Sequence, residues 1–218
     1  MLKRQFCSAL FLISSFAGLA GAQENACTKK LADVSPIPEF RDFRMGMTQA
    51  QVKARVPQVV FEPVNDLGLS KVSINPFFDA KIDKTSFEDV RTVSLDFLDG
   101  KLALLWIGFE NTFKWKTVDE FVKGVSPELG VSDQWNTKGR SQQLRCADFE
   151  LSVSMIAGGP SLRIVDSTAA ETLAARRQAK EDAAAAAEAA AAELHPVIGD
   201  TRKKIYYPSD CEALKTVP

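Results

Sequence analysis

The segment VRTVSLDFLDGKLALLWIGF, residues 90–109, constrains the fold most strongly because it has the pattern of a β-hairpin. Apolar and polar residues alternate from Val93 to Phe97, as in a strand that buries one face. Asp99-Gly100 then suits a two-residue type I′ turn. The returning segment, residues 102–109, is apolar at nearly every position, so we expect it to lie centrally in a sheet with both faces partly covered.

Two short amphipathic helices are predicted, one within residues 43–57 and one within residues 113–127. Each begins with a capping box, in which a Thr hydroxyl and the Gln or Glu side chain three residues later satisfy free N–H groups. The second helix also has apolar residues at the i, i+3, i+4, i+7 spacing of a buried face. The capping pairs are Thr48 with Gln51 and Thr117 with Glu120, and the apolar stripe is Val118, Phe121, Val122 and Val125.

Strands are predicted after both helices. QVVF, residues 58–61, and LSKVSI, residues 69–74, precede the hairpin. Residues 142–166 contain further alternating segments around a turn at Gly158-Gly159-Pro160. The order helix–strands–helix–strands predicts the α+β class, with one antiparallel sheet and short helices packed on one face. The repeated order also favours a tandem duplication.

The N-terminal residues have the pattern of a secretory signal peptide. Lys3 and Arg4 are followed by a short apolar run, and Ala20-Gly21-Ala22 supplies small residues at a cleavage site. We expect cleavage after Ala22 and a periplasmic or secreted protein, with no later segment apolar enough to span a membrane. Cys27 follows Glu-Asn-Ala, which is not the small and aliphatic context of a lipoprotein signal.

The chain that follows divides into four parts. Residues 23–38, with two prolines, are interpreted as an extended lead-in, and residues 39–166 as the α+β domain. Residues 167–194 are rich in alanine, open with a Thr168–Glu171 capping box and have no apolar stripe, so they predict a long solvated helix that acts as a spacer. A coiled coil is the alternative. Residues 195–218 are interpreted as a small hairpin.

The cysteine count is odd once the signal peptide is removed. Cys7 leaves with that segment, and Cys27, Cys146 and Cys211 remain. In an oxidising compartment we prefer a Cys27–Cys146 disulfide with one spare thiol. The alternative is three unpaired cysteines.

The stretch GMTQAQVKARVP, residues 46–57, resembles the helix opening of the BamE/SmpA outer-membrane assembly lipoproteins and of the related β-lactamase-inhibitor-protein fold. Those folds pack short helices against an antiparallel sheet, and the inhibitor proteins repeat the unit in tandem. The resemblance implies a periplasmic, non-catalytic, protein-binding module. It departs from the lipoproteins in the missing lipobox, and it identifies no functional residue.

The tail stretch IGDTRKKIYYPSDC, residues 198–211, is similar to a metal-binding hairpin of the Ada-type zinc domain and of some nuclease-associated proteins. That resemblance implies a zinc site with Cys211 and His195 as candidate ligands. However, Tyr207 occupies the position of a His or Cys ligand, and a second ligand pair has no counterpart. Because a structural zinc site needs four ligands, we prefer a hairpin without metal and keep zinc as the alternative.

The same tail could contact nucleic acid. Arg202, Lys203 and Lys204 stand beside Tyr206 and Tyr207, so cations that hold phosphate lie next to rings that stack on bases. The patch is short, and 25 basic residues against 28 acidic ones remain after removal of the signal peptide, which gives no basic field. We therefore interpret the patch as a solvated turn.

Enzymatic function is not favoured by the sequence. The single His lies in the tail, and no nucleophile, P-loop, zinc-protease or dinucleotide motif is present. No pair of carboxylates stands out, and the aromatic residues are interpreted as core rather than as a ligand pocket: Trp106, Phe109, Phe113, Trp115 and Trp135. The leading hypothesis is an exported, non-enzymatic module that binds an envelope protein. A metal- or nucleic-acid-associated accessory protein acting through the tail is the alternative.

Overall fold

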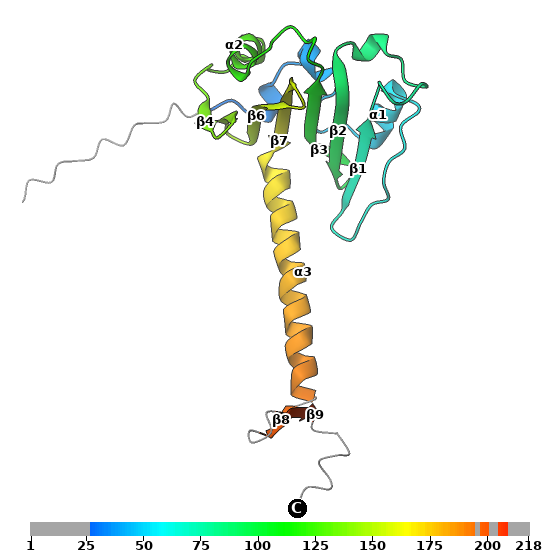
Figure 1. Cartoon of the computed structure of the whole chain (residues 1–218), viewed down its shortest axis with the longest axis vertical. Coiled ribbons are helices and arrows are strands. Elements are labelled where there is room, and N and C mark those ends of the chain that lie inside the picture. Colours follow the sequence, from blue (N-terminus) through cyan, green and yellow to red (C-terminus); the bar gives the residue numbers. More distant parts are fainter. Residues whose placement is uncertain (1–26, 195–196, 201–204, 209–218) are drawn as a thin grey trace, which may run out of the picture.

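The computed structural model describes residues 27–194, 197–200 and 205–208, and it has the predicted α+β architecture (Figure 1). A seven-stranded sheet in the order β1-β2-β3-β7-β6-β5-β4 is antiparallel throughout. Its strands are β1 (Leu69–Ile74), β2 (Val90–Leu98), β3 (Lys101–Phe109), β4 (Asn136–Lys138), β5 (Ser141–Arg145), β6 (Phe149–Ile156) and β7 (Gly159–Asp166).

The predicted hairpin is confirmed as β2 and β3. Asp99 and Gly100 have φ of 50° and 76°, the left-handed conformation that both central residues of a type I′ turn require. β3 lies between β2 and β7, near the middle of the sheet, as its apolar sequence predicts.

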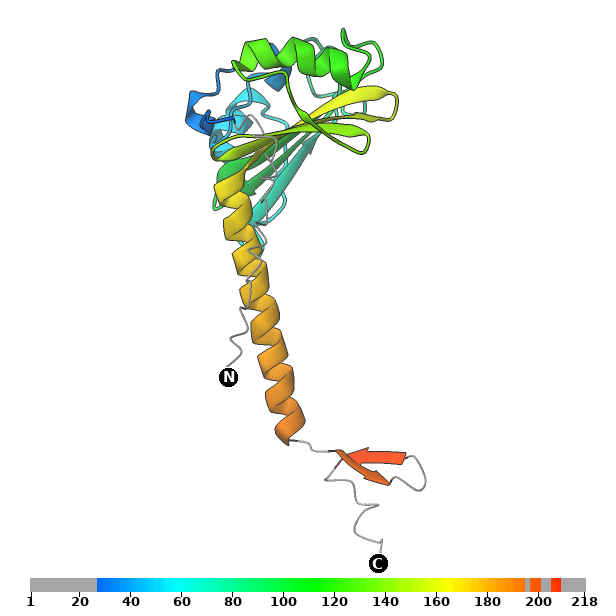
Figure 2. The same cartoon turned by 90° about the vertical axis from the view of Figure 1, so that its left-hand side faces the viewer.

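Two helices cover one face of the sheet: α1 (Gln49–Arg55) and α2 (Val118–Leu129) (Figure 2). The α1 capping box is complete, because the Thr48 hydroxyl accepts from the Gln51 N–H and the Gln51 side chain accepts from the Thr48 N–H. In α2 only half of the predicted box forms. Thr117 accepts from the Glu120 N–H, but the Glu120 carboxylate accepts from the N–H of Lys116 instead.

Both helices pack into a single hydrophobic core between themselves and the sheet. Val52 of α1 and Phe121 of α2 are fully buried in it. Each half of the domain has a helix followed by an antiparallel meander, and the last strands of the two meanders, β3 and β7, pair at the centre. This topology agrees with the tandem arrangement that the sequence favours.

Two local predictions were wrong. Residues 58–61 are a loop rather than a strand, because Val59 packs into the core and Phe61 packs edge-to-face on Phe97 at 5.4 Å while Val60 remains exposed. The β6–β7 turn consists of Ala157 and Gly158, one position earlier than predicted. Gly159 belongs to β7, where a Cβ atom would lie 2.1 Å from the Phe109 carbonyl oxygen. This glycine therefore permits a close backbone approach and does not form the turn.

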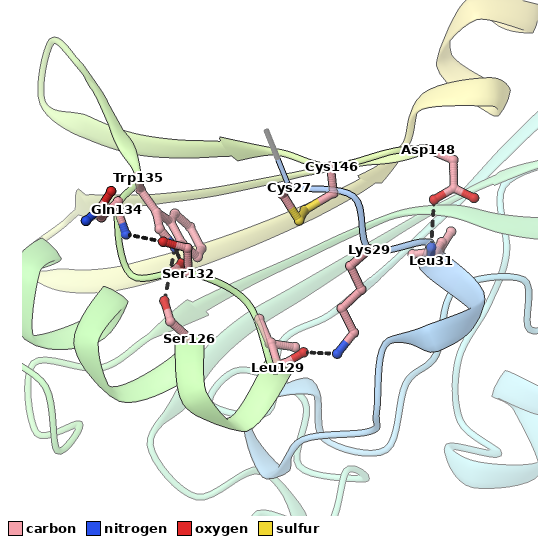
Figure 3. Close-up of a disulfide and its surroundings, with 10 residues drawn as sticks. All are labelled: Cys27, Lys29, Leu31, Ser126, Leu129, Ser132, Gln134, Trp135, Cys146 and Asp148. Carbon is pink, nitrogen blue, oxygen red and sulfur yellow. Dashed lines mark hydrogen bonds between the residues drawn. A yellow bond between two sulfur atoms is a disulfide. The ribbon is translucent and has the colours of Figure 1, made fainter. Parts of the chain in front are cut away.

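The segment predicted to be an extended lead-in is packed against the domain from Cys27 onward (Figure 3). It contains two 3₁₀ turns, η1 (Leu31–Asp33) and η2 (Pro38–Phe40), and a third, η3 (Thr85–Phe87), occurs between β1 and β2. The Leu31 N–H donates to the Asp148 carboxylate at 2.6 Å, and the Lys29 ammonium donates to the Leu129 carbonyl at the end of α2. The lead-in fails as a prediction because prolines reveal the absence of regular strands and helices but not tertiary contact.

The alanine-rich segment is α3 (Ser167–Leu194), a helix of 28 residues that leaves the end of β7 and points away from the body (Figure 1). Its first turn is capped by Asp166, which accepts from the Ala169 N–H at 3.0 Å, and not by Thr168 as predicted. At ~1.5 Å per residue the helix is about 42 Å long. No helix in the described part of the chain is long and apolar enough to cross a membrane.

Two ion pairs fix the direction of α3 against the body. The Arg176 guanidinium donates to both carboxylate oxygens of Asp99, at 2.9 and 2.7 Å, and Lys180 pairs with Asp66. These cations lower the pKa of the Asp99 and Asp66 carboxyls, mainly through the hydrogen bonds they donate. Beyond α3, β8 (Val197–Asp200) and β9 (Ile205–Pro208) pair as the antiparallel hairpin that the sequence predicts.

Candidate functional site

An exposed apolar surface lies at the end of the sheet opposite α3. β1 ends and β2 begins there, and the loop of residues 75–89 joins them (Figure 1). Within this loop Phe77 and Phe78 have 69% and 82% of their surface exposed. We name this surface the distal rim and define it as Pro76, Phe77, Phe78, Lys84, Phe87–Arg91 and Glu110.

The loop that carries the two Phe residues is held by its own hydrogen bonds. The Asn75 carbonyl accepts from the N–H groups of Phe78 and Asp79, and the Asn75 side chain accepts from the Thr92 hydroxyl at 2.9 Å. Farther along, the Asp83 carboxylate accepts from the Ser86 hydroxyl at 2.7 Å, which lowers the pKa of Asp83. The Phe pair is therefore presented on a loop with a defined conformation.

The two rings form an edge-to-face pair with centroids 5.3 Å apart, and the Lys84 ammonium lies 5.8 Å from the Phe77 centroid. A cavity of about 500 Å³ opens beside them, with Phe87 and Val90 in its wall. A second hollow, of about 370 Å³, lies on the other side of Phe78 and is lined in part by Val60. Phe78 thus forms an apolar ridge between two hollows, a shape that suits insertion of side chains from another protein.

The charges of the rim are unequally paired. Arg91 donates to the carbonyls of Ile156 and Ala157, at 3.1 and 3.4 Å, and so ties the rim to the β6–β7 turn. The Asp89 carboxylate accepts from the Thr112 hydroxyl at 2.6 Å. Within the described part of the chain, the carboxylates of Glu88 and Glu110 have no hydrogen-bond or ion-pair partner. The apolar cavity is consequently bordered by two uncompensated negative charges.

A buried carboxylate lies elsewhere, between η2 and α2. Glu39 is 3% exposed and pairs with the Lys114 ammonium at 2.7 Å, and Lys114 also lies 4.1 Å from the Trp115 ring. Partial burial, and then a hydrogen bond and charge repulsion from Glu39, raise the pKa of Glu128. Neither hollow beside Phe78 includes these residues. We therefore interpret the cluster as a contact between η2 and α2 and not as a reaction centre.

Replacing Glu128 by Gln is expected to remove part of the pH dependence of stability. A raised pKa means that the folded state holds the proton more tightly, so Glu128 stabilises the fold at low pH and this contribution is lost as the pH rises through the raised value. Above the ordinary Glu pKa of about 4.3, wild type should lose stability relative to E128Q, by under ~1 kcal/mol because solvent screens the exposed group.

The measurement is urea denaturation from pH 4 to pH 8. Glu181→Gln on the exposed surface of α3 serves as the matched control and should follow the wild-type curve. Parallel curves for wild type and E128Q over the whole range would show that Glu128 and Glu39 do not share a proton in the folded state.

The structure brings together one predicted pair of site residues. Cys27 and Cys146 form a disulfide, as we preferred from the sequence. Tyr206 and Tyr207 lie in β9, opposite Gly199 and Ile198. The remaining tail candidates lie outside the described residues, so zinc and nucleic-acid binding stay predictions: His195, Arg202, Lys203, Lys204 and Cys211. Among the described residues, no group of three or more His, Cys, Asp or Glu is placed to hold a metal ion.

The aromatic residues that we interpreted as core divide into two groups. Phe109, Phe113 and Trp135 are buried, whereas Trp106 and Trp115 are only partly buried. Sequence reasoning missed the distal rim. The signal that could have found it is NPFFDAK, residues 75–81, where two adjacent Phe residues interrupt a polar loop without continuing either strand pattern. No protein-family model matches this chain, and no curated protein or solved structure was found to be similar to it.

Proposed function

We propose that this protein is a non-enzymatic binding module of the bacterial cell envelope and that the distal rim is its contact surface for another protein. The observation that carries the proposal is the exposure of Phe77 and Phe78 beside an apolar cavity. Clustered aromatic side chains in a pre-formed hollow are typical of the residues that dominate binding energy at protein interfaces. The envelope location rests on the signal-peptide pattern and on the resemblance to BamE/SmpA proteins.

The architecture supports this function because it separates the rim from α3. The rim lies at one end of the sheet, and α3 leaves from the other end, with its direction held by Arg176 and Lys180 (Figure 2). A partner on the rim would therefore meet neither the helix nor the hairpin of the same chain. The helix would hold the C-terminal segment about 40 Å from the body.

Replacing both Phe77 and Phe78 by Ala is expected to abolish partner capture with little change in stability. Interface hot spots cost about 2 kcal/mol or more on truncation, which corresponds to a rise in Kd of roughly 30-fold. The immobilised protein would be incubated with envelope extract, retained proteins identified by quantitative mass spectrometry, and the Kd of the main one measured by calorimetry.

Val64→Ala is the matched control, because Val64 is a 61% exposed apolar residue that lies outside the rim. It should bind as wild type does. Equal capture by wild type and the double Phe variant, or capture that depends on residues 195–218 instead, would contradict the proposed function and favour the tail.

A further inference from the structure

We propose that the distal rim binds the basic-aromatic segment Arg202–Tyr207 of a second copy of this chain, so that copies associate head to tail. This proposal rests on the proposed function in one respect, namely that the rim is a protein-binding surface. It adds the identity of an occupant, and it follows from the charge of the rim, the composition of the tail and the geometry of α3.

The first argument is charge complementarity. Glu88 and Glu110 border the apolar cavity without a partner among the described residues, while the nearby cations are already engaged. Arg91 is bound to two backbone carbonyls and Lys84 lies over the Phe77 ring. An occupant that brings cations next to apolar side chains would satisfy both the carboxylates and the hollow.

The second argument is that the chain itself contains such a segment. Residues 202–207 read Arg-Lys-Lys-Ile-Tyr-Tyr, three cations followed by three large side chains. A cavity of about 500 Å³ can hold side chains of this size, and the edge of an aromatic pair is a favourable neighbour for tyrosine. The cations would then lie toward Glu88 and Glu110.

The third argument excludes binding within one chain. The helix α3 leads from the end of the sheet opposite the rim and is about 42 Å long, and the Arg176–Asp99 and Lys180–Asp66 pairs keep it directed away from the body. A tail at the far end of this helix cannot reach its own rim, so the occupant must come from another copy. Because the two surfaces differ, such contacts do not close a dimer and can continue from copy to copy.

The test is sedimentation velocity of the mature full-length protein over a concentration series. Wild type should show a progression of species with concentration, and added salt should weaken the association because the contact is partly ionic. The tail variant Lys203→Glu, Lys204→Glu and the rim variant Glu88→Lys, Glu110→Lys should each weaken association at least tenfold. A mixture of the two variants should restore association, since the reversed charges complement each other.

A second readout identifies the contact. Isotopically light and heavy protein would be mixed and treated with a carbodiimide, which couples lysine to carboxylate without a spacer. Crosslinks between Lys203 or Lys204 of one isotope and Glu88 or Glu110 of the other are expected. Wild type that stays monomeric to on the order of 1 mM, or association that neither charge variant changes, would overturn the proposal.

These outcomes are distinct from failure of the proposed function. A monomeric protein whose double Phe77→Ala, Phe78→Ala variant loses an unrelated envelope protein would overturn head-to-tail association and leave the rim as a binding surface. Head-to-tail association without capture of any other protein would support the present proposal alone.

Discussion

Loss of the Cys27–Cys146 disulfide is expected to lower the free energy of unfolding by about 4–5 kcal/mol. The bond joins residues 119 positions apart, and in the chain-entropy model the benefit of a crosslink grows with the loop it closes. It anchors the first described residue of the domain beside the loop between β5 and β6 (Figure 3). The double variant Cys27→Ser, Cys146→Ser would be compared with wild type by urea denaturation.

The choice of a double variant avoids an artefact, because a single substitution would leave a cysteine able to pair with Cys211. Cys211→Ser is the control and should leave stability unchanged. If C211S were as destabilising as the double variant, the pairing in solution would differ from that in the structure. The loss in the double variant also includes the contacts of Lys29 and Leu31, because both lie in the segment that the disulfide holds in place.

The elements that the sequence predicts correctly are those whose causes are local. The turn at Asp99-Gly100 needs two residues that accept positive φ, and the start of α1 needs a Thr and a Gln three positions apart. The extent of α3 follows from its alanine content, because helix propensity does not depend on a partner. Each of these signals lies within a few residues of the structure it predicts.

The features that the sequence does not predict depend on residues far apart in the chain. Arg176 and Asp99 are separated by 77 positions, and nothing in α3 indicates which of its charges will meet the body. Glu39 becomes a buried carboxylate only because Lys114 lies beside it in the fold. The exposure of Phe77 and Phe78 likewise follows from the path of the β1–β2 loop, since adjacent Phe residues in sequence are normally evidence of a core.

Replacing Phe121 by Ala is expected to lower the free energy of unfolding by about 3–5 kcal/mol, the usual cost of deleting a buried aromatic ring and leaving a cavity. Phe121 has no exposed surface, and its ring centroid lies 5.6 Å from that of Phe109 and 4.8 Å from that of Trp115. Because α2 attaches to the sheet through this cluster, the substitution should also loosen that half of the domain. Urea denaturation followed by tryptophan fluorescence gives the measurement.

Phe78→Ala is the matched control, since it removes the same ring from a site that is 82% exposed. Its effect on stability should stay within about 0.5 kcal/mol, as for ordinary surface substitutions. The two variants thus separate the roles of one residue type: Phe121 holds the fold together, whereas Phe78 adds almost nothing to it and is available for binding. A loss from F78A close to that from F121A would mean that the distal rim belongs to the core, and the proposed binding surface would then have no basis.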